Sequence, residues 1–193
     1  MAGRLGAIDE LAGNVERLAG KQVRDEVMQG SDQLKESSKP EKVAVWVQGA
    51  MQRLDTLVDE PTRSQIMGEC GRNCARINSR PIKAAIARRA KFDTLDDFLA
   101  AEQSKPPPGT RLLREGNSLY QFYTPSAFSH PMRCYCSLLR GLPSGETTSL
   151  TYCQCSRAFV QKYWEAVVGR PVEVELLRSA VSGAAECSFK IRL

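Results

Sequence analysis

The sequence predicts an α+β protein in which a helical N-terminal half precedes a small, mostly antiparallel sheet with a packed helix. Apolar residues recur every three to four positions from residue 5 to about residue 103, as on amphipathic helices. The segment 105–109 (KPPPG) then stops helix formation, because proline lacks an N–H donor and fixes φ. Beyond this segment the apolar period shortens to two, which is typical of strands.

Two apolar stripes define the first helices of the helical half. Their residues are Leu11, Val15 and Leu18, followed by Val43, Val47, Met51 and Leu54. Pro61 and Pro81 each begin a further helix, where a missing N–H costs nothing. Thr94, with Asp97 three residues later, resembles an N-capping arrangement for a last helix before the proline-rich segment.

The C-terminal half alternates between strands and one helix. Residues 111–114 and 119–123 flank residues 115–117 as a predicted hairpin, and residues 132–139 are a third strand candidate. A helix over 156–168 ends at Gly169 and Pro171. Two last strands are expected over 172–181 and 186–193. We therefore predict a helical region 1–104, a linker 105–109 and an α/β region 110–193, together forming one compact body.

Composition points to an ordinary globular protein of the cytoplasm. The chain has 193 residues, 42% of them hydrophobic and 25% charged, with no apolar run of membrane-spanning length. Acidic residues stand at positions 9 and 10, where an export signal would be apolar. The sequence therefore predicts a cytoplasmic protein without a membrane partner.

The seven cysteines are the most informative residues. They are Cys70, Cys74, Cys134, Cys136, Cys153, Cys155 and Cys187. Cytosolic reductants keep thiols open, so such cysteines are more often ligands or redox groups than disulfides, and their odd number agrees with this. Simple burial in the core is the plain alternative, because free cysteine is among the most buried residue types.

Spacing indicates how pairs of these thiols could share a centre. Cys70 and Cys74 are one helical turn apart, a separation that lets two side chains bind one ion. On a strand, Cys134 and Cys136 would present their sulfurs on the same face, with Tyr135 on the other. The two pairs are thus expected to form edges of one site.

The remaining thiols lie near a helix start and on the last strand. Cys153 and Cys155 immediately precede the helix expected from Ser156, where the dipole would lower a thiol pKa and favour ligation or reactivity. Cys187 lies on the final strand. Four thiolates suit tetrahedral zinc, whereas seven sulfurs would also suit an iron–sulfur cluster, so the cofactor remains zinc or a cluster.

A family resemblance rests on residues 155–175 (CSRAFVQKYWEAVVGRPVEVE) and 182–189 (SGAAECSF). This stretch resembles the vinyl-4-reductase (V4R) domain, and the whole chain is similar to a cysteine-rich bacterial offshoot of that group. The resemblance implies a small-molecule sensor with a zinc site near an apolar ligand pocket. It implies Cys187 as the last zinc ligand and Cys153 near the first. Ser179 and Leu176 replace a cysteine and an acid of that pattern, so Cys134, Cys136 or Cys155 would have to complete the site.

Other candidate residues support weaker hypotheses. His130, the only histidine, is a loop residue or an additional ligand. An aromatic group could line an apolar pocket, although core packing is the plainer explanation; its members are Tyr120, Phe122, Tyr123, Phe128, Tyr163 and Trp164. The densest basic patch comprises Arg80, Lys83, Arg88, Arg89 and Lys91, and a net charge of +5 makes it more consistent with a solvated helix face than with a nucleic-acid partner.

The sequence therefore predicts a sensor-like protein that binds a metal ion or an iron–sulfur cluster through clustered thiolates and can also take a small apolar ligand. One alternative is a thiol-redox or electron-transfer enzyme, in which Cys153 or Cys155 would be reactive. The other is a basic nucleic-acid-binding regulator, for which we find no helix-turn-helix motif.

Overall fold

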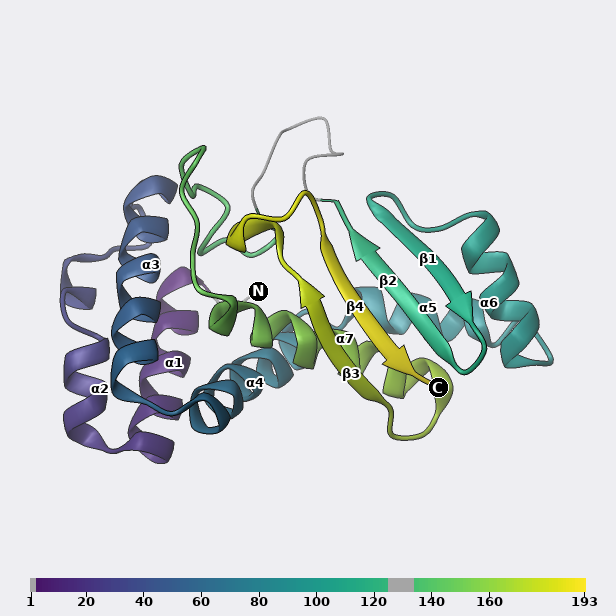
Figure 1. The fold of residues 1–193 in the computed structure, drawn as a ribbon, viewed down its shortest axis with the longest axis horizontal. Helices are drawn as coiled ribbons and strands as arrows, with labels where there is room; N and C mark the ends of the chain where they lie inside the picture. Colours follow the sequence, from purple (N-terminus) through teal and green to yellow (C-terminus); the bar gives the residue numbers. More distant parts are fainter. Residues whose placement is uncertain (1–2, 125–133) are drawn as a thin grey trace.

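A computed structural model describes residues 3–124 and 134–193, and Figure 1 shows its helices and strands. The helices are α1 (Arg4–Ala19), α2 (Lys21–Val27), α3 (Pro40–Leu57), α4 (Glu60–Ile77), α5 (Arg80–Arg89), α6 (Leu95–Ser104) and α7 (Gln154–Val168). The strands are β1 (Thr110–Glu115), β2 (Ser118–Tyr123), β3 (Glu173–Arg178) and β4 (Cys187–Arg192). Short 3₁₀ helices are η1 (Ser31–Gln33), η3 (Leu150–Cys153) and η4 (Ala180–Ser182). The predicted fold class is confirmed.

The apolar stripes predicted for the first helices form one core. Val15, Val47 and Leu54 are fully buried where α1, α3 and α4 meet. Capping residues define where the later helices begin. The Asp59 side chain accepts a hydrogen bond from Thr62 N at the start of α4, and Thr94 Oγ1 accepts one from Asp97 N at the start of α6. The capping arrangement predicted at Thr94 is therefore confirmed.

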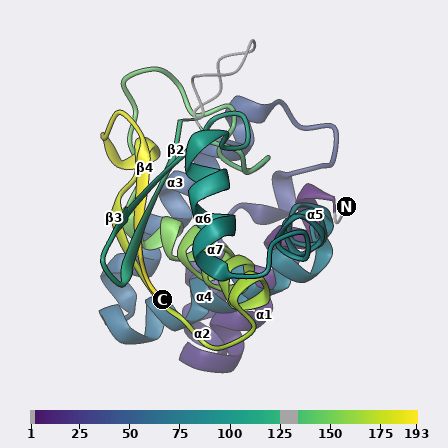
Figure 2. The same cartoon turned by 90° about the vertical axis from the view of Figure 1, so that its right-hand side faces the viewer.

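The four strands form one antiparallel sheet in the order β1-β2-β4-β3. Gly116 has φ +57° in the tight turn of the predicted hairpin, a conformation that favours glycine. Helices cover one face of this sheet, as Figure 2 shows with the strands on one side and α7 behind them. Leu119, Phe189 and Trp164 are buried in this second core, together with Phe98 of α6.

One predicted strand is wrong. Residues 134–139, the described part of the candidate 132–139, form a bend and turns. Leu138 and Leu139 are both buried, and with Leu142 they enter the core of the N-terminal helices. Two successive buried side chains do not suit a half-exposed strand, whose neighbouring residues point to opposite faces. The apolar residues of this segment anchor a loop instead.

The proline-rich segment separates the last predicted helix from the first strand, since α6 ends at Ser104 and β1 begins at Thr110. Each of the two hydrophobic cores combines elements that do not follow one another in the sequence. Residues of α5 and α6 belong to the same core as the sheet and α7, whereas the loop around Leu139 belongs to the core of α1, α3 and α4. The chain therefore crosses between the two cores more than once.

Candidate functional site

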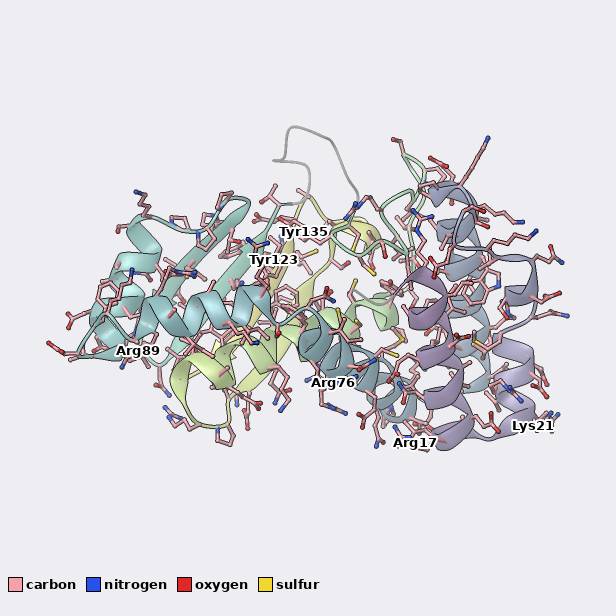
Figure 3. All side chains as sticks on the ribbon, turned by 180° about the vertical axis from the view of Figure 1, so that it is seen from behind. Arg17, Lys21, Arg76, Arg89, Tyr123 and Tyr135 are labelled. Atoms are coloured by element: carbon pink, nitrogen blue, oxygen red, sulfur yellow. The ribbon has the colours of Figure 1, made fainter. Side chains whose placement is uncertain are left out.

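The seven cysteines come from four separate parts of the chain. Cys70 and Cys74 lie on α4, and Cys134 and Cys136 on the loop that follows the undescribed residues 125–133. Cys153 ends η3, Cys155 lies in the first turn of α7 and Cys187 begins β4. All seven are free thiols. Figure 3 shows sulfur atoms gathered between the N-terminal helices and the sheet half.

The crossing of α4 and α7 brings the two thiols of α4 close to Cys155 of α7. Gly71 of α4 lies directly against the backbone of Cys155, so that a side chain at residue 71 would overlap the Cys155 carbonyl oxygen. Its Cβ would also stand only 2.8 Å from Ala158 Cβ. Small residues permit this close approach of two helix backbones. Cys70 and Cys74, on either side of Gly71 in sequence, are thereby held near Cys155.

The loop of residues 134–149 brings two further thiols near the α4–α7 crossing. Gly141 packs against the backbone of Pro40 so closely that an added Cβ would lie 2.5 Å from the Pro40 carbonyl carbon. Cys136 Sγ lies 3.0 Å from the Tyr152 hydroxyl, and Cys136 N donates to Cys134 Sγ at 3.4 Å. The expectation that these two sulfurs share one face of a strand is wrong, because the segment turns. The loop nevertheless delivers both thiols to the group.

Cys155 is the centre of the arrangement. Burial raises its pKa well above the ordinary value, and charge on four other thiols would raise it further. These four are Cys136, Cys74, Cys70 and Cys134. We call these five residues the Cys155 group. Charges act on one another's pKa in this way only when the side chains lie near one another.

A lowered pKa at the start of α7 was predicted for Cys153 and Cys155, and this prediction is wrong. Burial raises the pKa of Cys153 to about 12, and that of Cys155 is also raised. Desolvation disfavours the thiolate more than the helix dipole favours it. The same cause raises the pKa of Cys70 to about 11 and raises the pKa values of Cys74, Cys134 and Cys187.

Cys153 and Cys187 lie around Ser179 and adjoin the Cys155 group, because charge on either thiol would raise the pKa of Cys134. Cys153 Sγ lies 2.9 Å from Ser179 Oγ, and a hydrogen bond with Ser179 lowers the pKa of Cys187 against the effect of burial. Ala180 N also donates to Cys187 Sγ at 3.4 Å. Charge on Cys187 would raise the pKa of Cys153, so the two thiols are neighbours. Three of the four positions that the V4R resemblance singles out, Cys153, Ser179 and Cys187, thus lie together.

Amide donors surround the sulfurs of α4. Asn14 Nδ2 of α1 donates to Cys70 Sγ at 3.4 Å, and Asn78 Nδ2 donates to Cys74 Sγ at 3.4 Å. Neither asparagine is among the site residues that the sequence predicts. Asn14 could have been noticed, because it is a polar residue beside the apolar stripe of the first helix and is only 7% exposed. No comparable signal marks Asn78.

Within residues 3–124 and 134–193, no three Cys, His, Asp or Glu side chains are arranged so that they would already hold a metal ion. His130 lies outside the described residues. The donor set of the Cys155 group is soft and rich in sulfur, which fits zinc or an iron–sulfur cluster chemically. Binding would require rotation of these side chains toward one another.

The aromatic residues predicted to line a pocket or fill the core divide between two places. Trp164 is buried and donates to Gln121 Oε1 at 2.6 Å, and Tyr123 and Tyr163 pack on the same core. Phe122 lies beneath the guanidinium of Arg111, 3.7 Å from the ring centroid, and Tyr120 lies near Lys190. Phe128 lies outside the described residues.

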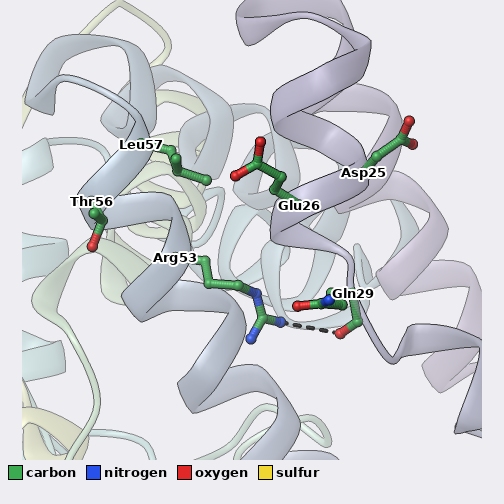
Figure 4. Close-up of a pocket in the computed structure, with 6 residues that line it drawn as sticks. All are labelled: Asp25, Glu26, Gln29, Arg53, Thr56 and Leu57. Carbon is green, nitrogen blue, oxygen red and sulfur yellow. Dashed lines mark hydrogen bonds between the residues drawn. The ribbon is translucent and has the colours of Figure 1, made fainter.

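A separate groove lies between α2 and α3 (Figure 4). Its lining consists of Asp25, Glu26, Gln29, Arg53, Thr56 and Leu57. Arg53 donates to the backbone carbonyl of Gln29 at 3.2 Å. None of the thiols lines this groove, so it does not correspond to the apolar ligand pocket expected near the zinc site.

A search of the described helices finds none with the length and apolar composition needed to cross a membrane. Comparison with curated proteins gives no match. A family model described as a family of unknown function, DUF6144, matches residues 7–193. The match takes in both cores and all seven cysteines. The chain therefore belongs to the DUF6144 family.

Proposed function

We propose that the Cys155 group binds a thiophilic metal centre, either a zinc ion or an iron–sulfur cluster, and that the protein acts as a sensor-like binding module. The observation that carries this proposal is the close packing of α4 on Cys155 at Gly71, together with the influence that charges on the thiols of α4 and of the loop of residues 134–149 would have on Cys155. Five sulfurs in one poorly solvated place are enough for a tetrahedral zinc site or for the ligands of a cluster.

The surroundings of the sulfurs support this proposal. Amide N–H groups can only donate, so the sulfurs of Cys70 and Cys74 are the acceptors of the Asn14 and Asn78 hydrogen bonds. Such donors stabilise thiolate charge and orient ligands in metal sites. The chain itself thus supplies both the sulfur donors and a second layer of groups that would hold them.

The raised thiol pKa values fit a ligand role better than a nucleophilic one. A reactive cysteine needs a lowered pKa and access to solvent, whereas burial raises the pKa of Cys153 and Cys155. The thiol-redox enzyme is therefore the weaker candidate. A bound metal would displace the thiol protons, so we expect binding to release protons and to strengthen as pH rises.

A sensor role is supported by where the thiols lie between the cores. Cys70, Cys134, Cys136 and Cys155 pack against the core of α1, α3 and α4, whereas Cys187 packs against the core of the sheet. A centre held there would link α4, the loop and α7. Occupancy could then change how the two cores are held together. The V4R resemblance suggests the same class of role and remains a prediction.

The experiment is metal and sulfide analysis of protein purified without oxygen, with a visible spectrum, for the wild type and two serine variants. We expect stoichiometric zinc in a colourless protein, or iron and sulfide with broad visible absorption. Cys155→Ser should lose most of the metal, because it removes the central donor. Cys187→Ser is the matched control and should retain it, because Cys187 packs on the core of the sheet beside Ser179 and not at the α4–α7 crossing.

Cys74→Ser provides a second test should Cys155→Ser fail to fold, because Cys74 is partly exposed and lies near the end of α4. It should lose the metal as well. Wild-type protein without metal after anaerobic purification, failing also to take up zinc or iron, would refute the proposal. Equal metal loss in Cys187→Ser and Cys155→Ser would refute the ligand set.

A further inference from the structure

Two arginine side chains meet over Gly68, a buried residue of α4 near the crossing with α7. A Cβ built on Gly68 would lie 3.6 Å from Arg72 Nη1 and 3.9 Å from Arg157 Nη2. Both guanidiniums therefore approach within 4 Å of the same point, one from α4 and one from α7. Glycine leaves the space between them free of a side chain.

The charges here are not balanced. Glu69 lies 2.8 Å from Arg72 and 3.8 Å from Arg17, so one carboxylate serves two arginines. Among residues 3–124 and 134–193, no carboxylate lies within 4 Å of the Arg157 guanidinium. Residues 125–133 contain no aspartate or glutamate, so they cannot supply one either. Arg157 is thus a half-buried cation beside a like charge, without an anionic partner from the chain.

The polar contacts of Arg157 hold its guanidinium in place without neutralising it. Nε donates to Gln154 Oε1 at 2.7 Å, and Nη1 lies 3.5 Å from the Val174 carbonyl oxygen. Nη2, the atom nearest Gly68, has no hydrogen-bond partner in the described part of the chain. A half-buried cation that lacks an anionic partner is stabilised when an anion binds beside it.

We propose that Arg72 and Arg157 form a binding site for a phosphate-like oxyanion at the Gly68 position. Guanidinium forks match the geometry of phosphate oxygens and bind them with charge-assisted hydrogen bonds. Arg72 reaches the anion from α4, and Arg157, oriented by Gln154, reaches it from α7. The site adjoins the thiols, since Arg72 and Arg157 each stand two residues from a cysteine of the Cys155 group, but the proposal does not depend on a bound metal.

Isothermal titration calorimetry with inorganic phosphate tests this proposal directly. Titration with sodium chloride at matched ionic strength controls for general screening of charges. Wild-type protein should bind phosphate saturably. Arg157→Gln and Arg72→Gln should each weaken binding about tenfold or more, the size expected for loss of a charged hydrogen-bonding group. Circular dichroism checks that each variant is folded. If Arg157→Gln does not fold, the phosphate affinity of Arg72→Gln tests the proposal.

Arg76→Gln is the matched control. Arg76 also lies on α4, one turn beyond Arg72, where its guanidinium donates to Asn73 Oδ1 at 2.7 Å, and Figure 3 labels it. This variant removes the same charge and should bind phosphate like the wild type. Absence of saturable phosphate binding by the wild type would overturn the proposal. So would an equal loss in Arg76→Gln, or binding of a single-stranded oligonucleotide without binding of inorganic phosphate.

Discussion

Individual thiols of the Cys155 group and its neighbours are poor acids in this fold. A thiol whose pKa is about 11, such as Cys70, carries its proton at neutral pH unless a metal replaces it. Cys153, with a pKa of about 12, behaves in the same way. Their chemistry therefore depends on what binds them rather than on spontaneous ionisation.

Stability should fall at alkaline pH for protein stripped of metal. Unfolded cysteines ionise near pH 8.5, whereas Cys70 and Cys153 stay protonated in the folded chain until about pH 11 and about pH 12. Above about pH 9 the unfolded state therefore binds fewer protons than the folded state, and the free energy of unfolding decreases. Urea denaturation at about pH 8 and about pH 10 should show this decrease.

The alkaline decrease in the free energy of unfolding should be smaller in Cys70→Ala, because that variant has one thiol fewer to ionise on unfolding. A free energy of unfolding that does not change between the two pH values in the wild type would contradict the raised thiol pKa values.

Asn14 offers a residue-scale test of the second layer around the sulfurs. Asn14→Ala removes the N–H donor to Cys70 Sγ, so metal affinity should fall about tenfold or more, as for other groups that orient metal ligands. A competition titration with a coloured chelator measures the affinity. Asn73→Ala is the control and should leave affinity unchanged, since Asn73 Oδ1 accepts a hydrogen bond from Arg76 and, among the described residues, Asn73 bonds no thiol. Equal affinities in all three proteins would contradict the role of Asn14.

At the scale of the elements, the α4–α7 crossing positions the site. Gly71→Ala should lower the free energy of unfolding by about 1–3 kcal/mol, because the methyl group would overlap the Cys155 carbonyl and force the helices apart. Gly68→Ala is the matched control in the same helix. Its Cβ would make ordinary contacts, so this variant should be neutral or more stable by up to about 1 kcal/mol.

Denaturant unfolding of both glycine variants measures the difference. Gly71→Ala should also lose metal if the crossing holds Cys70 and Cys74 near Cys155. A Gly71→Ala protein as stable as Gly68→Ala would show that the crossing is not as tight as described.

Local signals predicted the elements well where one face of a helix or strand is buried. The stripe at Val43, Val47 and Leu54 and the cap at Thr94 both depend on neighbours within one or two turns, so they could be predicted from sequence. The loop structure of the segment around Leu138 could not be predicted from sequence, because its apolar residues pack on helices that are far away in sequence. Contacts of that kind leave no periodic pattern.

The candidate site divides in the same way. Clustering of the cysteines was expected from their number and spacing, and Cys155 does lie near Cys70 and Cys74. The upward shift of the thiol pKa values could not be predicted in this way. The sequence indicates where a helix starts, but it does not indicate how deeply the residues there are buried. Ser179 illustrates the same limit, since only the folded chain places it against Cys153.

At the scale of the whole molecule, the thiols lie where two hydrophobic cores meet. If a metal centre joins α4, the loop and α7, its removal should weaken the connection between the cores. Protein stripped with a chelator should unfold at a lower temperature than loaded protein, as differential scanning calorimetry can measure. Cys155→Ser should show no such difference between treated and untreated samples. Identical unfolding temperatures for loaded and stripped wild type would contradict a centre at this junction.

The most direct measurement is X-ray absorption spectroscopy at the metal edge of protein purified without oxygen. The proposed site predicts a first shell of sulfur atoms at about 2.3 Å from the metal, supplied by the Cys155 group. A first shell made of nitrogen and oxygen would contradict the account, because the cysteines would then not be the ligands.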